Sequence, residues 1–276
     1  MLARLFRLRL SLMNGFAAAA GYLLFPSPVQ RPTLLALFLG VALMAAAGSA
    51  LNQVLERDLD ALMRRTCDRP LPTKKLSPAA AALAGLAALA AGASLLFIAA
   101  GAVPAAVALV TLIWYLALYT PLKRVSSLAL LVGGVCGCGA PLVGWSAAGG
   151  GLGDFRIVLL AGVIYLWQVP HFWQLQRKEA DDYRRAGFHV FTPAVGKKGS
   201  APLGRLWIIS MITATLMLPV FGVVQAAPIL CALLLPLPFL FLSWRRWDRV
   251  AALVLHCYPL LVTLAIFGGK FIGGAV

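Results

Sequence analysis

The chain has 276 residues, of which 61% are hydrophobic and only 12% are charged, and its formal net charge is +15. A soluble domain usually has about 25% charged residues, so this composition excludes an ordinary soluble protein and predicts a polytopic membrane protein. A high positive charge can also indicate nucleic-acid binding. Here the cations follow the membrane topology instead, so we expect no nucleic-acid partner.

Nine apolar stretches along the chain are long enough to cross a bilayer, which takes roughly 20 residues of helix. They cover residues 11–26, 33–55, 79–100, 103–120, 127–147, 156–176, 204–225, 227–243 and 251–272. The sequence therefore predicts an all-α polytopic membrane protein with nine transmembrane helices. An odd number of spans puts the two ends of the chain on opposite sides of the membrane.

The connections between these stretches carry the cations very unevenly. Most Lys and Arg residues fall in the N-terminal segment and after the second, fourth, sixth and eighth stretches. The other side has only Arg31, Arg156 and Lys270. Cytoplasmic segments next to membrane helices are enriched in Lys and Arg. We therefore expect a bacterial inner-membrane protein with a cytoplasmic N-terminus and an external C-terminus.

A polar segment follows the second apolar stretch, where the chain is expected to leave the membrane. Asn52, Glu56 and Asp60 recur every four residues, so on a helix these three side chains, here called the acidic row, share one face. Mg²⁺ prefers a few carboxylates together with substrate phosphates, and Arg64 continues the row with a cation. The pattern predicts a magnesium and phosphate site. The alternative is a solvated helix end that is neutralised by Arg57 and Arg64.

The sixth apolar stretch and the segment after it carry a second group of polar side chains. Gln168, His171, Lys178 and Asp182 fall on one helical stripe, and Trp167 precedes them. Polar and ionisable groups inside a membrane span are costly and usually face a cavity. We therefore predict that the stripe lines a cavity. The alternatives are a hydrogen-bonded packing histidine at His171 and an interfacial belt for the tryptophans.

The two polar segments resemble one another. Each has acidic residues at a helix end, then an Arg pair, then Lys-Lys-x-Ser, at Lys74 to Ser77 and at Lys197 to Ser200. Their equivalent positions favour a single domain, residues 1–276, with a weak internal repeat of approximately 1–125 and 126–250 around a shared cavity.

Three further side chains are notable. Lys123, at the end of the fourth stretch, is either a phosphate contact or a positive-inside anchor. His189 and His256 have no partners that the sequence identifies, and we assign them no role.

With these motifs the chain resembles the UbiA superfamily of intramembrane prenyltransferases, and the resemblance covers nearly its whole length. Four blocks carry the resemblance: Asn52 to Pro72 (NQVLERDLDALMRRTCDRPLP), Tyr119 to Arg124 (YTPLKR), Ala140 to Trp145 (APLVGW) and Trp167 to Gly187 (WQVPHFW through DDYRRAG). The Trp-Gln-x-Pro-His block resembles the branch that modifies haem rather than the branches that prenylate quinone or chlorophyll precursors.

The resemblance implies nine transmembrane helices around a central cavity, with the two acidic segments forming a cytoplasmic cap. It also implies Mg²⁺-dependent transfer of a farnesyl group from farnesyl diphosphate to a vinyl group of haem B, which gives haem O and diphosphate. The implied catalytic residues and magnesium ligands are Asn52, Glu56, Asp60 and Asp182. The implied diphosphate-binding residues are Arg64, Arg69, Lys123 and Lys178, and the implied acceptor-binding residues are Trp167, Gln168 and His171.

The chain also departs from the superfamily's pattern. Gln53 and Glu56 replace two Asp residues of the first acidic motif, and Ala186 leaves the second motif incomplete. The same fold acting on an aromatic acceptor such as a quinone precursor is one alternative, and a membrane transporter is the alternative from another class.

The expected partners are the two substrates, farnesyl diphosphate and haem B, and the lipid bilayer. Association with haem A synthase or oxidase-assembly proteins is left open.

Overall fold

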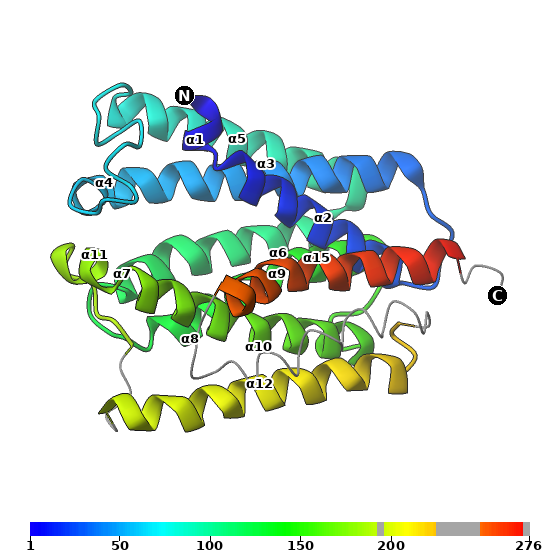
Figure 1. Ribbon diagram of the computed structural model, residues 1–276. Coiled ribbons are helices and arrows are strands. Elements are labelled where there is room, and N and C mark those ends of the chain that lie inside the picture. The colour runs from blue at the N-terminus through cyan, green and yellow to red at the C-terminus, as the bar shows by residue number, and fades with distance from the viewer. Residues whose placement is uncertain (192–195, 225–248, 273–276) are drawn as a thin grey trace.

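The computed structural model describes residues 1–191, 196–224 and 249–272 of the chain. Within these ranges the regular structure is helical, and the long helices run side by side as an elongated bundle (Figure 1). The helices are α1 (Leu2–Leu5), α2 (Leu8–Leu24), α3 (Arg31–Leu55), α4 (Arg57–Asp60), α5 (Pro78–Ala100), α6 (Ala102–Ile113), the π-helix η1 (Trp114–Tyr119), α7 (Thr120–Leu122), α8 (Ala129–Cys136), α9 (Gly139–Ala147), α10 (Phe155–Lys178), α11 (Ala180–Arg185), α12 (Gly196–Val220) and α15 (Arg249–Ile272).

Six helical segments among the described residues are long and apolar enough to cross a membrane. They are Arg31–Leu55, Pro78–Ala100, Ala102–Leu122, Ala129–Ala147, Phe155–Lys178 and Leu253–Lys270. The first and seventh predicted stretches coincide with α2 and with the apolar part of α12, Leu206–Val220. The eighth stretch, 227–243, lies outside the described residues, so the count of nine stays a prediction.

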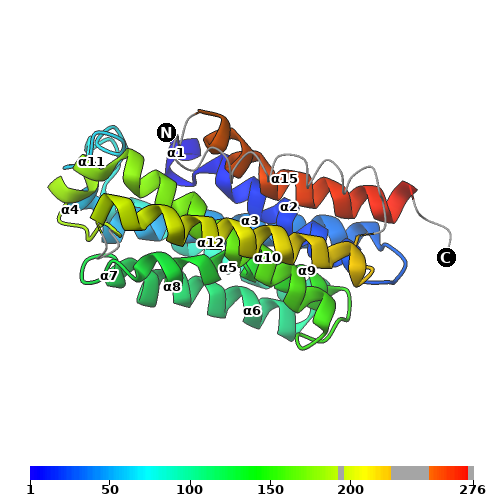
Figure 2. The same cartoon turned by 60° about the horizontal axis from the view of Figure 1, so that its bottom comes forward.

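The first half of the bundle is built on α3, which packs along α5 and against α2. Helix α2 also contacts α9 and α15, and Figure 2 shows α2 and α15 lying close together. Two glycines bring α2 and α9 together, because a Cβ at Gly21 would overlap the Pro141 carbonyl and a Cβ at Gly144 would overlap that of Ala18. In a bilayer such small residues stabilise a helix pair by letting the backbones approach closely.

The second half is built on α10, which packs against α12, α8 and α15. Its core includes Trp173 on α10, and Trp145 on α9 belongs to the same apolar cluster; both side chains are fully buried. Large apolar side chains such as Leu83, Ile98 and Val110 are exposed on the outside of α5 and α6. An apolar exterior of this kind matches the lipid environment that the composition predicts.

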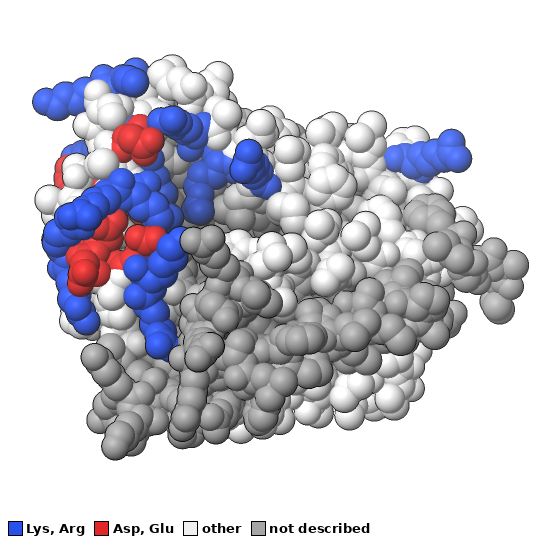
Figure 3. Space-filling view, in the orientation of Figure 1, with Lys and Arg blue, Asp and Glu red and all other residues white. Residues whose placement is uncertain are grey.

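Charged side chains gather at one end of the bundle, the end where α1, α4 and α11 lie (Figures 1 and 3). Two long helices reach this end and are interrupted there in the same way. Helix α3 stops before Glu56, which has φ −108° and ψ 10°, and the short helix α4 follows. Helix α10 stops before Glu179, which has φ −107° and ψ 26°, and α11 follows. Each break turns a short acidic helix across the end of the bundle.

Candidate active site

The acidic row is buried at the charged end, although its helix is not continuous. Asn52, Glu56 and Asp60 are 5%, 5% and 4% exposed. Hydrogen bonds from Glu56 N to Asn52 O (2.9 Å) and from Asp60 N to Glu56 O (2.8 Å) run across the helix break. They keep the spacing of the row, because each bond joins residues four apart.

Arg64 does not continue the row. Helix α4 ends at Asp60, and the chain then runs through a series of turns in which the Arg64 side chain is exposed. The prediction that Arg64 extends the same helical face is therefore wrong. The four-residue spacing places a side chain only as far as the helix continues, and α4 ends at Asp60.

Each carboxylate of the predicted metal site contacts a cation. Lys123 Nζ lies 2.7 Å from Glu56 Oε1 and donates to Oε2 at 2.9 Å. Arg69 Nη1 donates to Asp60 Oδ2 at 2.6 Å. Asp182, which is 4% exposed, forms an ion pair with Arg185. The structure thus brings two of the predicted diphosphate-binding cations, Lys123 and Arg69, onto the acidic row.

Burial shapes the electrostatics of these pairs. It raises the pKa of the Asp60 carboxyl, while the charge of Arg69 and its hydrogen bond oppose the increase. Burial also lowers the pKa of the Lys123 ammonium, and Glu56 opposes that decrease. Charges that are removed from water interact more strongly with an incoming ion than exposed charges do. The group is therefore suited to a charged ligand such as a diphosphate.

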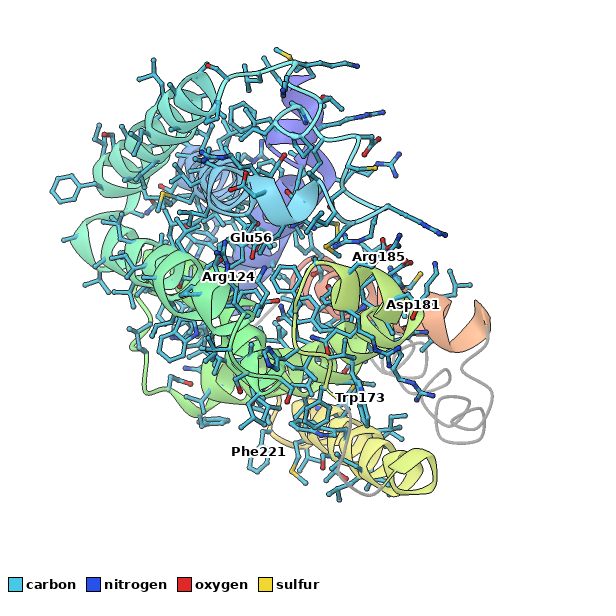
Figure 4. The ribbon with its side chains drawn as sticks, turned by 90° about the vertical axis from the view of Figure 1, so that its left-hand side faces the viewer. Glu56, Arg124, Trp173, Asp181, Arg185 and Phe221 are labelled. Atoms are coloured by element: carbon cyan, nitrogen blue, oxygen red, sulfur yellow. The ribbon has the colours of Figure 1, made fainter. Side chains whose placement is uncertain are left out.

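Asp182 connects the second acidic segment to the first. The backbone N–H of Arg65 donates to Asp182 Oδ2 at 3.1 Å, across 117 positions of sequence. Nearby, Met63 packs with Ala186 and Phe188 in a small apolar cluster. Figure 4 looks onto this end and shows Glu56 near the middle of the bundle, with Arg185 and Asp181 together on α11 to its right. The two acidic segments therefore meet, as the sequence predicted.

The amide of Asn52 is held in one orientation. Its Nδ2 donates to Thr120 Oγ1 at 3.1 Å, and Thr120 Oγ1 donates to the Tyr115 carbonyl at 2.8 Å. Thr120 directly follows the π-helix η1, and π-helical turns are frequent at functional sites. Since the amide nitrogen is engaged, the Asn52 oxygen is the atom that remains to accept a donor or ligate a metal ion. Sequence analysis gave Thr120 no role.

The predicted stripe from Gln168 to Asp182 is interrupted. Gln168 and His171 lie on α10, whereas Asp182 lies on α11, beyond the break at Glu179. Lys178 is 78% exposed, and its Nζ lies 4.0 Å from Glu179 Oε1. The structure therefore does not bring Lys178 to the buried carboxylates, and the prediction of one continuous stripe is wrong.

The three predicted acceptor-binding residues lie within the membrane-spanning part of α10. Gln168 is 9% exposed. The rings of Trp167 and His171 are stacked at a centroid distance of 4.9 Å. The buried Nδ1 atom of His171 has no hydrogen-bond partner within the described part of the chain. That observation argues against a hydrogen-bonded packing role for this atom.

Aromatic rings connect this group to the acidic row, a feature that the sequence analysis missed. Lys123 Nζ lies 5.0 Å from the centroid of the Tyr119 ring. Tyr119 is stacked on Phe172 at 6.4 Å with an interplanar angle of 8°, and Phe172 contacts His171 at 5.9 Å. The rings form a continuous path from the charged end into the membrane-spanning part of the bundle.

The sequence analysis also missed Arg7. This residue has a left-handed backbone (φ 43°, ψ 55°), which is strained for a side chain other than glycine. Burial lowers the pKa of the Arg7 guanidinium; Tyr115 opposes the decrease, while Arg69 and Arg65 add to it. Strained backbone commonly occurs at functional sites. Arg7 thus adds a further cation to the charged end, from a segment that carries no motif.

Gln53 explains how the segment before α2 is held. Its side chain is fully buried, and Nε2 donates to the carbonyls of Leu5 (2.6 Å), Arg4 (3.3 Å) and Ser49 (3.3 Å). Gln53 therefore faces the N-terminal segment and supports it. The amide N–H groups are what this position requires, because three carbonyl oxygens converge on it.

Replacing Gln53 by Asp, the residue that the resemblance implies at this position, should consequently harm the protein. Gln53→Asp would place a carboxylate against carbonyl oxygens in a buried site, and we expect a loss of about 2–4 kcal/mol in the free energy of unfolding. Gln53→Ala should cost less, since it removes the donor without adding a charge. Thermal unfolding of the purified variants in detergent measures both. An Asp variant as stable as the wild type would contradict this role.

The acidic row fits magnesium by the chemistry of its atoms. Among the described side chains no group of three or more His, Cys, Asp or Glu residues is arranged to hold a metal ion. The row instead offers two carboxylates and an amide oxygen, all buried. Mg²⁺ is commonly bound by one or two carboxylates together with substrate phosphates. Asn52, Glu56 and Asp60 match that requirement, with the adjacent cations available to the phosphates.

The sequence is similar to a known protein family along most of its length. The model of the UbiA prenyltransferase family matches residues 13–266. A protein named protoheme IX farnesyltransferase from Geobacter sulfurreducens is 51% identical over 265 residues, which are 95% of this chain and 96% of that protein.

Two of the solved structures of similar shape are UbiA homologues. The apo structure of a UbiA homologue from Aeropyrum pernix K1 has a TM-score of 0.75 at 20% identity, covering 94% of this chain and 98% of the other. A UbiA homologue from Archaeoglobus fulgidus bound to DMAPP and Mg²⁺ has a TM-score of 0.70 at 18% identity, covering 100% and 99%. At these identities the likeness shows the fold, and it confirms the all-α fold that was expected from the sequence.

Proposed function

The chain belongs to the UbiA prenyltransferase family, and from that premise we propose that it transfers a farnesyl group from farnesyl diphosphate to a vinyl group of haem B. The products are haem O and diphosphate. The observation that carries the proposal is the buried set of ion pairs, Glu56 with Lys123 and Asp60 with Arg69, at the charged end of the aromatic path. The 51% identity to a protein named for farnesyl transfer to protoheme supports the choice of donor and acceptor.

The acidic row and Asp182 are the proposed magnesium site, formed by Asn52, Glu56, Asp60 and Asp182. Mg²⁺, when bound, neutralises the diphosphate and stabilises the negative charge that develops on it. Lys123 and Arg69 pair with the carboxylates in the structure, so they are positioned to bind the diphosphate oxygens directly. Arg64 and Lys178 are exposed, and we place them at the approach to the site, where cations speed the association of an anionic substrate.

The proposed reaction forms one carbon–carbon bond and one carbon–oxygen bond. The bond between C1 of the donor and its diphosphate oxygen breaks, and its electron pair leaves with the diphosphate. The π electrons of the vinyl group then bond to C1. Water supplies a hydroxyl group to the other vinyl carbon, and its proton goes to solvent. The acceptor thereby gains a hydroxyethylfarnesyl group.

The aromatic path has two roles in this proposal. Tyr119 and Phe172 present ring faces between the charged end and His171. Ring faces stabilise a nearby cation, and the apolar surroundings keep water away from the allylic cation until the acceptor has attacked. The proposed acceptor residues Trp167, Gln168 and His171 lie at the far end of this path. The donor and acceptor sites are therefore connected through the interior of the bundle.

The proposed orientation places the charged end of the bundle in the cytoplasm. Charged side chains are concentrated there in Figure 3, around α1, α4 and α11, and cytoplasmic segments of membrane proteins carry an excess of Lys and Arg. Farnesyl diphosphate, which is anionic and water-soluble at its diphosphate end, would then bind from the cytoplasm. A transporter would more usually place its polar site near the bilayer midplane, whereas these carboxylates lie at the end of the helices.

The choice of acceptor tests the proposal. Membranes that contain the protein are incubated with labelled farnesyl diphosphate and either haem B or 4-hydroxybenzoate, and prenylated products are separated by chromatography. We expect label on haem and none on the benzoate. Label on the benzoate alone would show that the acceptor is an aromatic acid such as a quinone precursor and not haem. Uptake of an unmodified substrate into vesicles, without product, would favour a transporter.

A further inference from the structure

Two of the chain's three histidines contact each other between α10 and α15. His171 on α10 and His256 on α15 lie with ring centroids 4.8 Å apart at an interplanar angle of 74°. We call these two side chains the imidazole pair. Trp167 stacks on His171, and Trp167 Nε1 donates to the Leu255 carbonyl at 2.6 Å, which joins α10 to α15 next to the pair.

The imidazole pair lies where ionisable side chains cost free energy, which indicates that it binds a ligand. Both histidines lie within segments that are long and apolar enough to cross a membrane. Ionisable side chains in such segments are rare and usually mark a functional site. His256 is exposed, whereas His171 lies behind it with a buried Nδ1 atom that has no hydrogen-bond partner in the described part of the chain. The pair thus presents an accessible imidazole on a membrane-spanning helix.

The pair also lies at the end of the aromatic path from the acidic row. His171 contacts Phe172, Phe172 stacks on Tyr119, and Lys123 of the donor site lies over Tyr119. A flat aromatic acceptor held at the pair would therefore lie next to the path that leads to the donor site. An imidazole nitrogen adds one further property to this location, because it is a common ligand of haem iron.

We propose that the imidazole pair recognises the acceptor through its iron, with His256 as the ligand and His171 as the residue that positions it. This inference rests on the proposed function and extends it to the metal centre of the acceptor. Haem between two imidazoles would need ring centroids roughly 6 Å apart or more, since each metal–nitrogen bond is about 2 Å long. At 4.8 Å the two rings cannot ligate opposite faces of one haem. We therefore expect one histidine, His256, to ligate the haem iron.

Spectroscopic titration tests the proposal without relying on turnover. Ferric haem B and metal-free protoporphyrin IX are titrated into the purified protein, followed by the Soret band and by fluorescence. The variants are His256→Ala, His171→Ala and, as a matched control, His189→Ala, which changes the third histidine on an exposed part of the cap. Farnesyl diphosphate binding is measured on every variant as a check of folding.

We expect the wild type to give a spectrum with one axial imidazole and to bind haem about tenfold or more tightly than protoporphyrin IX. His256→Ala should lose the imidazole spectrum and that preference. His171→Ala should keep the spectrum but bind haem more weakly, and His189→Ala should behave as the wild type. Equal affinity of the wild type for the two porphyrins would overturn the proposal even if a variant failed to fold. So would a bis-imidazole spectrum or an unchanged spectrum in His256→Ala.

The outcomes also separate this inference from the proposed function. A wild type that farnesylates haem B and protoporphyrin IX equally well retains the proposed reaction but does not recognise iron. A wild type that farnesylates neither porphyrin fails the proposed function itself.

Discussion

Replacing Asp60 by asparagine should lower the rate of farnesyl transfer by about 100- to 1000-fold, which is the usual cost of removing one group that stabilises developing charge. Asp60 is 4% exposed and is paired with Arg69 at 2.6 Å. Asparagine has nearly the same shape but no charge, so the variant removes a proposed magnesium ligand with little change in packing. The measurement is haem O formation at saturating farnesyl diphosphate and varied Mg²⁺.

Asp58 provides a matched control for this result. It lies on the same short helix, but its side chain is 86% exposed and pairs with the neighbouring Arg57 at 3.4 Å. Asp58→Asn therefore removes the same charge two positions away and should leave the rate within about twofold, because exposed ion pairs contribute little. Equal losses in the two variants would indicate a general effect of charge. An active Asp60→Asn protein would remove Asp60 from the metal site.

Replacing Lys123 by methionine should have the second large effect, on both activity and stability. The change removes a cation from the diphosphate site and leaves Glu56 buried without its partner. We expect transfer to fall by about 100-fold and the free energy of unfolding to fall by about 2–4 kcal/mol, since a buried charge that loses its partner is strongly destabilising. Enzyme assays and thermal unfolding measure the two quantities.

Two further variants separate these effects. Lys123→Met combined with Glu56→Gln removes both charges, so it should recover much of the stability but none of the activity. Lys178→Met makes the same change at a side chain that is 78% exposed, and it should affect neither stability nor the maximal rate. A Lys178 variant as impaired as the Lys123 variant would show that the exposed cation, too, acts in the site.

The residues whose predicted spacing the structure keeps are those whose pattern is local. Asn52, Glu56 and Asp60 are four apart, and the hydrogen bonds across Glu56 preserve that spacing. The apolar stretches likewise predict the helices, because length and composition suffice to identify them. The approach of Asp182 to the first acidic segment followed from the resemblance and from the similarity of the two segments, and the Arg65 N–H now gives it a contact.

The errors arise where local periodicity ends. Helix α4 ends at Asp60, so Arg64 lies in the turns beyond it and not on the helical face of the acidic row. The break at Glu179 puts Asp182 on α11, past the end of α10 on which Gln168 and His171 lie. Lys178 stays on α10, but its side chain is 78% exposed. Neither the break at Glu56 nor the one at Glu179 contains a Pro or Gly that could have announced it. Tertiary packing across the end of the bundle determines them instead.

Other residues were missed because their partners are distant in sequence. The imidazole pair joins positions 85 apart on α10 and α15, and Gln53 supports a segment almost 50 positions before it. Arg7 lies in that segment, outside any motif, and reaches the site only because α1 folds over the end of the bundle. A single sequence holds no record of such contacts.

The central claim is that this protein joins a farnesyl group to haem in a magnesium-dependent reaction. The most direct test incubates purified protein in lipid nanodiscs with farnesyl diphosphate, haem B and Mg²⁺, and follows haem by mass spectrometry and free diphosphate by enzymatic assay. We predict a haem product heavier by one farnesyl group and one hydroxyl group, with one diphosphate released per product, and loss of both on addition of EDTA. Diphosphate release without a haem product, or an unchanged rate in EDTA, would contradict the account.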